Sequence, residues 1–107
     1  MIDKENLSPL QQTIIEVLKL TEDPEIPINI WDLGLIYDIE TDSQNNINIT
    51  MTLTSPHCPM AESLLNDVKT AIENIPDTGV VNVKITFTPP WSMDRMSTEA
   101  KLDLGFL

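Results

Sequence analysis

The chain carries a single thiol, Cys58, which stands directly before Pro59, a residue well suited to the first position of a helix. Cys58 would then occupy the N-cap position, where its sulfur could accept the free N–H groups of Met60 and Ala61 and where the helix dipole favours a thiolate. Such a thiolate can act as a nucleophile or as a metal ligand. The alternative is a buried, inert cysteine that fills a small apolar gap. Its position before a helix and between two prolines favours a functional thiol.

Asp32 is the acidic candidate for the same site. Its carboxylate could be a metal ligand, together with Cys58, or a proton acceptor. The alternative is structural, because Asp32 stands three residues after Asn29 and this spacing closes a capped turn. A self-contained structural zinc site is excluded, since the chain has one cysteine and one histidine and such a site needs four clustered ligands.

Thr54 and Trp91 are the candidate supporting residues. Thr54, like Thr52, is expected on the polar face of a strand, where it either contacts a partner or is simply a residue type that strands favour. Trp91 follows two prolines and either covers the thiol or plugs the core. His57 adjoins the thiol and is either a second ligand or an exposed loop residue, and the second interpretation is favoured because neighbours in a tight turn usually point apart. Trp31 is interpreted as a packing residue.

The apolar spacing predicts the elements that must position these side chains. A helical turn capped by Asn29 and closed by a left-handed Gly34 is expected before the first strand. The other predicted elements are a helix that begins after Ser8 and ends before Asp23, strands over 35–40, 47–54 and 81–88, a helix over 59–75, and a short helix that begins at Met93 or Ser97 and ends at Gly105.

The order of these elements predicts the fold. The first two strands form an antiparallel hairpin, and the helix that follows is long enough to return the third strand parallel to the second. We expect an α/β fold, in the form of an α+β-like two-layer sandwich with a small mixed three-stranded sheet and helices mainly on one face. Residues 1–107 form one domain, with a flexible N-terminus over 1–7. All candidate site residues then gather at one sheet edge, beyond the ends of the parallel strands, where ligands usually bind.

Composition excludes several classes of function. The formal net charge is -11, without clustered Lys and Arg, which argues against nucleic acid as a partner. No apolar run is long enough for a membrane span, and the N-terminus lacks the pattern of a signal peptide. A lone cysteine forms no intrachain disulfide and is typical of a reducing compartment. We therefore expect a cytoplasmic protein that does not bind membranes.

Three ordered segments carry a family resemblance. Together they resemble the iron–sulfur cluster assembly family in its SufT-like single-domain form, and the matching residues are Asp23–Tyr37, Thr50–Pro59 and Pro89–Ser92, followed by Met96–Ser97 and Leu104–Gly105. The resemblance implies an accessory factor in the maturation of iron–sulfur proteins, whose partners are the assembly machinery and client apo-proteins. It matches Cys58 to the reactive cysteine of the family and Asp32 to its acidic residue. It assigns no role to His57.

One thiol cannot hold an iron–sulfur cluster, which normally takes four protein ligands. No permanently bound cofactor is therefore expected, and iron or a cluster would be shared transiently with a partner or across a homodimer. The sequence thus predicts a transient carrier or an adaptor rather than an enzyme. Two alternatives remain. A thiol enzyme would use Cys58 as its nucleophile, but the one histidine is its direct neighbour rather than a separately placed base. A structural interaction module would use the Thr-rich outer face of the sheet.

Overall fold

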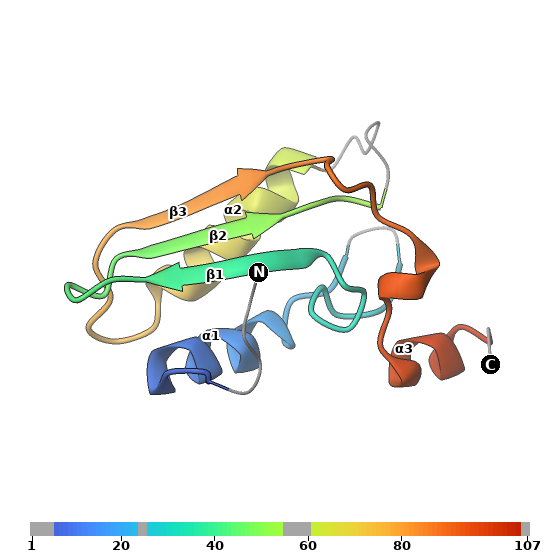
Figure 1. The fold of residues 1–107 in the computed structure, drawn as a ribbon, viewed down its shortest axis with the longest axis horizontal. Coiled ribbons are helices and arrows are strands. Elements are labelled where there is room, and N and C mark those ends of the chain that lie inside the picture. The colour runs from blue at the N-terminus through green and yellow to red at the C-terminus, as the bar shows by residue number, and fades with distance from the viewer. Residues whose placement is uncertain (1–5, 24–25, 55–60, 106–107) are drawn as a thin grey trace.

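The computed structural model describes residues 6–23, 26–54 and 61–105 (Figure 1). Its three strands form one sheet in the order β1-β2-β3, in which β1 is antiparallel to β2 and β3 is parallel to β2. The predicted hairpin and parallel crossover are confirmed. In chain order the elements are α1 (Pro9–Leu18), β1 (Ile36–Thr41), β2 (Ile47–Met51), α2 (Ala61–Glu73), β3 (Val81–Ile85), the 3-10 helix η1 (Met93–Arg95) and α3 (Thr98–Asp103).

Helix α1 begins with a capping box. The Ser8 hydroxyl accepts the Gln11 backbone N–H at 3.1 Å, and the Gln11 side-chain oxygen accepts the Ser8 N–H at 2.9 Å. These two bonds satisfy N–H groups that the first helical turn leaves without partners. The amide nitrogen of Gln11 also donates to the Ile39 carbonyl at 2.9 Å, so the same side chain ties α1 to β1.

The core lies between the sheet and the helices α1 and α2. Helix α2 crosses behind the sheet in Figure 1, and α1 packs against both α2 and β1. Alternate strand residues point into this layer, as the two-residue period of a strand requires. The fully buried members are Ile14, Leu18, Ile39, Ile47, Ile49, Met51, Leu64, Val68 and Ile72. The predicted two-layer arrangement is therefore confirmed.

Two strands end earlier than their sequence patterns predict. β2 ends at Met51 instead of residue 54, and β3 ends at Ile85 instead of residue 88. The last bond between them runs from the Thr86 N–H to the Met51 carbonyl at 2.9 Å. Phe87, which was expected to point inward, is 44% exposed, because it lies beyond the end of the sheet.

The segments around the sheet follow the predicted signals closely. Gly34 closes the turn before β1 with a φ of 78°, in the left-handed region. The predicted last helix is divided into η1 and α3, and the Ser97 hydroxyl caps α3 by accepting the Ala100 N–H at 3.1 Å. Residues 1–5 of the predicted flexible N-terminus lie outside the described residues. Within the described part of the chain, no helix is long and apolar enough to cross a membrane.

Candidate functional site

One edge of the sheet gathers the candidate site. The start of β1 and the ends of β2 and β3 lie side by side at the right of the sheet in Figure 1. The turn over 29–34, residues 52–54 and the segment after β3 therefore meet there, as the sequence predicts. Cys58 and His57 lie outside the described residues, so their predicted placement at this edge stays a prediction.

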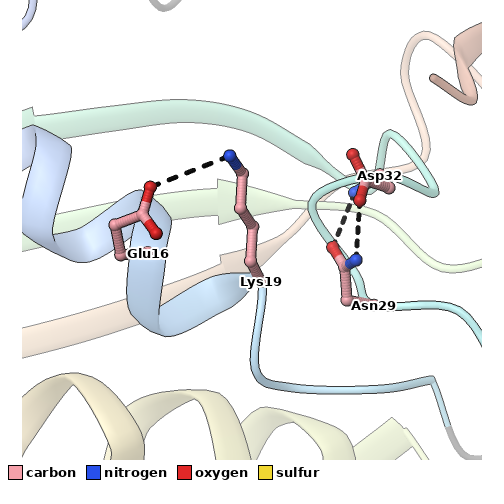
Figure 2. Close-up of polar contacts among 4 residues, drawn as sticks. All are labelled: Glu16, Lys19, Asn29 and Asp32. Atoms are coloured by element: carbon pink, nitrogen blue, oxygen red, sulfur yellow. Dashed lines mark hydrogen bonds and ion pairs between the residues drawn. The ribbon is translucent and has the colours of Figure 1, made fainter. Parts of the chain in front are cut away.

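Asp32 is held by Asn29 within the turn (Figure 2). The Asn29 side-chain oxygen accepts the Asp32 backbone N–H at 2.9 Å, and the Asn29 amide nitrogen donates to the Asp32 carboxylate at 2.7 Å. The capped-turn interpretation is thus confirmed, although the reciprocal bond comes from the Asn29 side chain instead of its backbone. The carboxylate keeps further acceptor capacity, because an ionised carboxylate offers about four lone-pair sites.

Asp32 lines a hollow of about 340 Å³. Acidic side chains gather around it, and they come from the segment after α1, from the turn and from α3. Lys19 also lines the hollow and pairs with Glu16 at 3.8 Å (Figure 2).

Within residues 6–23, 26–54 and 61–105, no three His, Cys, Asp or Glu side chains are grouped to hold a metal ion. A metal at Asp32 therefore needs donors from the rest of the chain or from a partner. The lining carboxylates are Glu22, Asp32, Glu99 and Asp103.

Trp91 bridges back to the turn. Its indole N–H donates to the Leu33 carbonyl at 2.7 Å, and its ring packs half-buried against the core. This packing supports the interpretation of Trp91 as a residue that fills the core. The other interpretation, that Trp91 covers the Cys58 thiol, stays a prediction. Trp31 is likewise half-buried against the core, and it lines a second hollow beside α1.

The sequence did not predict that Tyr37 and Arg95 belong to this edge. The Tyr37 hydroxyl donates to the Pro89 carbonyl at 2.8 Å, and the guanidinium of Arg95 lies 4.6 Å from the centre of the Tyr37 ring. Arg95 is the single arginine of this acidic chain, and that scarcity was the signal that could have drawn attention to it. A cation held over an aromatic face is stabilised by the ring electrons.

These bonds define a C-terminal strap, residues 86–97, that crosses the sheet. The strap leaves β3 on one side of β2 and bonds to Tyr37 and Leu33 on the other side. It therefore passes the end of β2. At its far end, the Ser97 N–H donates to the Asp32 carbonyl at 2.7 Å. Gly34 lies so close to Arg95 that a Cβ atom added to Gly34 would overlap the Arg95 backbone.

Thr54 and Thr52 lie where β2 leaves the sheet. Thr54 is half-buried at the edge, and its contact with a partner stays a prediction. Thr52 was expected to be exposed on the polar face, but it is fully buried. The expectation was wrong because strand alternation gives the direction of a side chain but not its burial, which depends on what packs over that face.

The fold is that of a small α+β domain with a mixed three-stranded sheet, and segments from three parts of the chain meet at one edge of this sheet. The family of the chain follows from comparison with known proteins: it belongs to the iron–sulfur cluster assembly protein family, whose model matches residues 11–85. The predicted SufT-like membership is confirmed, and the predicted role in iron–sulfur protein maturation is confirmed at the level of the family.

Individual relatives agree over most of their lengths. The chain is 42% identical to an Fe-S protein maturation auxiliary factor from Porphyromonas gingivalis, over 91% of this chain and 92% of the relative. It is 42% identical to the Fe-S protein maturation auxiliary factor SufT from Staphylococcus aureus, over 78% of this chain and 94% of the relative. The crystal structure of a domain of unknown function, DUF59, from Bacillus anthracis superposes with a TM-score of 0.86 at 40% identity and covers 92% of this chain and 93% of that one.

Proposed function

We propose that the chain is an accessory factor of iron–sulfur protein maturation that acts as a transient carrier or an adaptor through Cys58. The observation that carries the proposal is the single sheet edge at which the turn with Asp32, the end of β2 with Thr54 and the strap with Trp91 meet. The chain segment between β2 and α2, which bears Cys58, starts from this edge.

The cargo must be shared. The chain has one cysteine, and a cluster normally takes four protein ligands. In our proposal Cys58 contributes one sulfur, and the assembly machinery, a client apo-protein or a second copy of the chain supplies the others. The cluster is then a substrate in transit, and a resident cofactor or a catalytic cycle is not needed.

The other site residues have supporting roles in this proposal. Asp32 keeps its carboxylate in a fixed orientation because the Asn29 amide nitrogen donates to that carboxylate, while the Asn29 side-chain oxygen accepts the Asp32 backbone N–H. Trp91 holds the strap against the turn, and Thr54 offers a hydroxyl to a partner that docks at the edge. Together they would position a partner so that Cys58 exchanges iron, a cluster or a client thiol with it.

Replacement of Cys58 by Ala tests the proposal. In cells that lack the native copy, C58A is expected to leave an iron–sulfur enzyme at the low activity of the deletion strain, whereas S43A is expected to restore it. Ser43 is a suitable control because it is exposed in the loop between β1 and β2, at the opposite end of the sheet. Full restoration by C58A, at the same expressed level, would show that the thiol is not used.

A second measurement tests the sharing of the cargo. Anaerobic titration with Fe(II) and sulfide, followed by light scattering, is expected to give cluster absorbance only together with a dimer or with an added partner. A stable cluster on a monomer of the isolated chain would contradict the shared site.

A further inference from the structure

Thr52 carries a fully buried hydroxyl at the end of β2. The residue is 0% exposed, and its Oγ1 has no hydrogen-bond partner among the residues that the structure describes. Only its backbone is engaged, because the Thr52 N–H donates to the Leu35 carbonyl at 2.8 Å. Most buried side-chain polar atoms are hydrogen-bonded, and one that is not lowers the stability of the fold. An orphaned group of this kind calls for a physical reason.

The direction of the side chain follows from its neighbours. Met51 and Leu53 both belong to the buried core. Since successive side chains of an extended segment point to opposite faces, Thr52 points away from the core, to the face that carries Thr50. Thr50 is half-exposed on that face, whereas Thr52 is covered completely.

The C-terminal strap passes the end of β2, where Thr52 lies, and it is fixed by the Tyr37 bond to Pro89 and by the Trp91 bond to Leu33. Neither of these bonds, nor any other hydrogen bond among the residues that the structure describes, reaches the Thr52 hydroxyl. A valine of nearly the same shape would fill this position without the penalty of an unpaired polar atom.

The hydroxyl also lies at the edge to which the proposed function brings cargo. Thr52 stands six residues before Cys58, at the end of the strand that leads to it. A thiolate or a cluster sulfide carries negative charge and accepts hydrogen bonds, and a threonine hydroxyl has one proton to donate. This chain, with a net charge of -11, offers few cations that could stabilise such a sulfur.

We infer that the Thr52 hydroxyl is a hydrogen-bond donor reserved for a sulfur atom that arrives at this edge, either the sulfide of a cluster or the thiolate of a client cysteine. The inference rests on the proposed function. Binding opens the packing around Thr52, and the hydroxyl then gains the partner that it lacks among the described residues of the free chain. Stability of the free chain and maturation activity therefore oppose each other at this position.

Replacement of Thr52 by Val separates the two effects. T52V is expected to raise the midpoint of thermal unfolding of the free chain by about 4 °C, because a penalty of about 1 kcal/mol is removed. The same variant is expected to lower the maturation of an iron–sulfur enzyme in cells by about tenfold, the loss typical of a hydrogen bond to a charged acceptor. T52S keeps the hydroxyl and is expected to retain maturation.

The matched control is T50V, the same substitution two residues earlier on the same strand face. It is expected to change neither maturation nor the thermal midpoint by a comparable amount, since Thr50 is half-exposed. A T52V chain that supports full maturation overturns the inference. So does a T52V chain that unfolds at a lower temperature than the wild type, because the hydroxyl would then already be well paired.

Two further arms identify the sulfur and separate this inference from the proposed function. If T52V retains less cluster than the wild type after anaerobic loading with Fe(II) and sulfide, the partner is a cluster sulfide. If loading is unchanged and maturation still falls, the partner is a client thiolate. If C58A supports full maturation, the proposed function fails and the inference fails with it. If C58A is inactive and T52V is fully active, only the inference fails.

Discussion

Side chains that bond to backbone atoms hold the site edge together. Asn29 uses both ends of its amide on Asp32, Trp91 donates to the Leu33 carbonyl, and Tyr37 donates to the Pro89 carbonyl. Each of these bonds joins a side chain to a loop that has no sheet ladder of its own. A bond of this kind contributes about 1 kcal/mol when partly buried. The shape of the edge therefore depends on a few residues, and single substitutions there can change this shape without unfolding the core.

Asp42 makes the same kind of contact at the opposite end of the sheet, in the loop between β1 and β2. Hydrogen bonds from the Asn46 backbone N–H, the Asn46 side chain and the Gln44 N–H lower the pKa of the Asp42 carboxyl below 3.8. A lowered folded-state pKa means that the ionised form stabilises the fold at pH values above the unfolded pKa. This contribution is lost as the pH falls through the folded pKa.

The substitution D42N removes this charge and keeps the shape of the side chain. We expect urea titrations to show a lower free energy of unfolding for D42N than for the wild type at pH 7, with the gap closing as the pH falls below 3.8. D67N, on the exposed side of α2, is the control and is expected to match the wild type. A gap for D42N that is the same at pH 7 and at pH 3 would contradict the role of the ionised carboxylate.

The strap is the element that joins the three parts of the site edge, and it is also the element that the sequence predicted least well. Local signals identified the hairpin, the crossover helix and the caps at Ser8 and Ser97, because each depends on residues within one turn or one strand. The path of the strap depends on bonds across more than 50 positions, such as Trp91 to Leu33. No local pattern encodes such a bond. Strand alternation likewise did not predict that Thr52 is buried and that Phe87 is exposed, although the edge itself was predicted.

The close approach of the strap to the turn is tested by G34A. Gly34 has a φ of 78°, and a Cβ there would overlap the Arg95 carbonyl group. Gly105 has nearly the same φ, 79°, but a Cβ there meets nothing within 4 Å. G105A therefore measures the backbone strain alone, which is about 1 kcal/mol for a left-handed alanine.

We expect G34A to lower the free energy of unfolding by more than about 2 kcal/mol, since the strain and the overlap add. The tryptophan fluorescence of the chain should change as well, because Trp91 bonds to Leu33 and Trp31 bonds to Gly34 in the displaced turn. Equal losses for G34A and G105A in urea titrations would show that the strap yields freely and does not fix the edge.

At the scale of the whole molecule, the charge of -11 is spread over the chain but gathers locally where α3 meets the turn. Glu22, Asp32, Glu99 and Asp103 line the same hollow there, and Lys19 is the single cation among the described residues that line it. Like charges that share a hollow repel each other, and salt screens the repulsion over about 10 Å at 0.1 M. The fold should therefore gain stability as ionic strength rises from a low value.

Asp103 contributes most directly to this charge repulsion. It is the last residue of α3, where the negative end of the helix dipole adds to the repulsion from its neighbours. D103N is expected to raise the free energy of unfolding by about 0.3–1 kcal/mol at low ionic strength, and the gain should shrink in 0.5 M NaCl. E62Q provides a control of opposite sign, because Glu62 lies in the first turn of α2, where a negative charge is favourable. If D103N and E62Q shift the urea midpoint in the same direction, net charge alone decides stability and the local arrangement at the hollow does not.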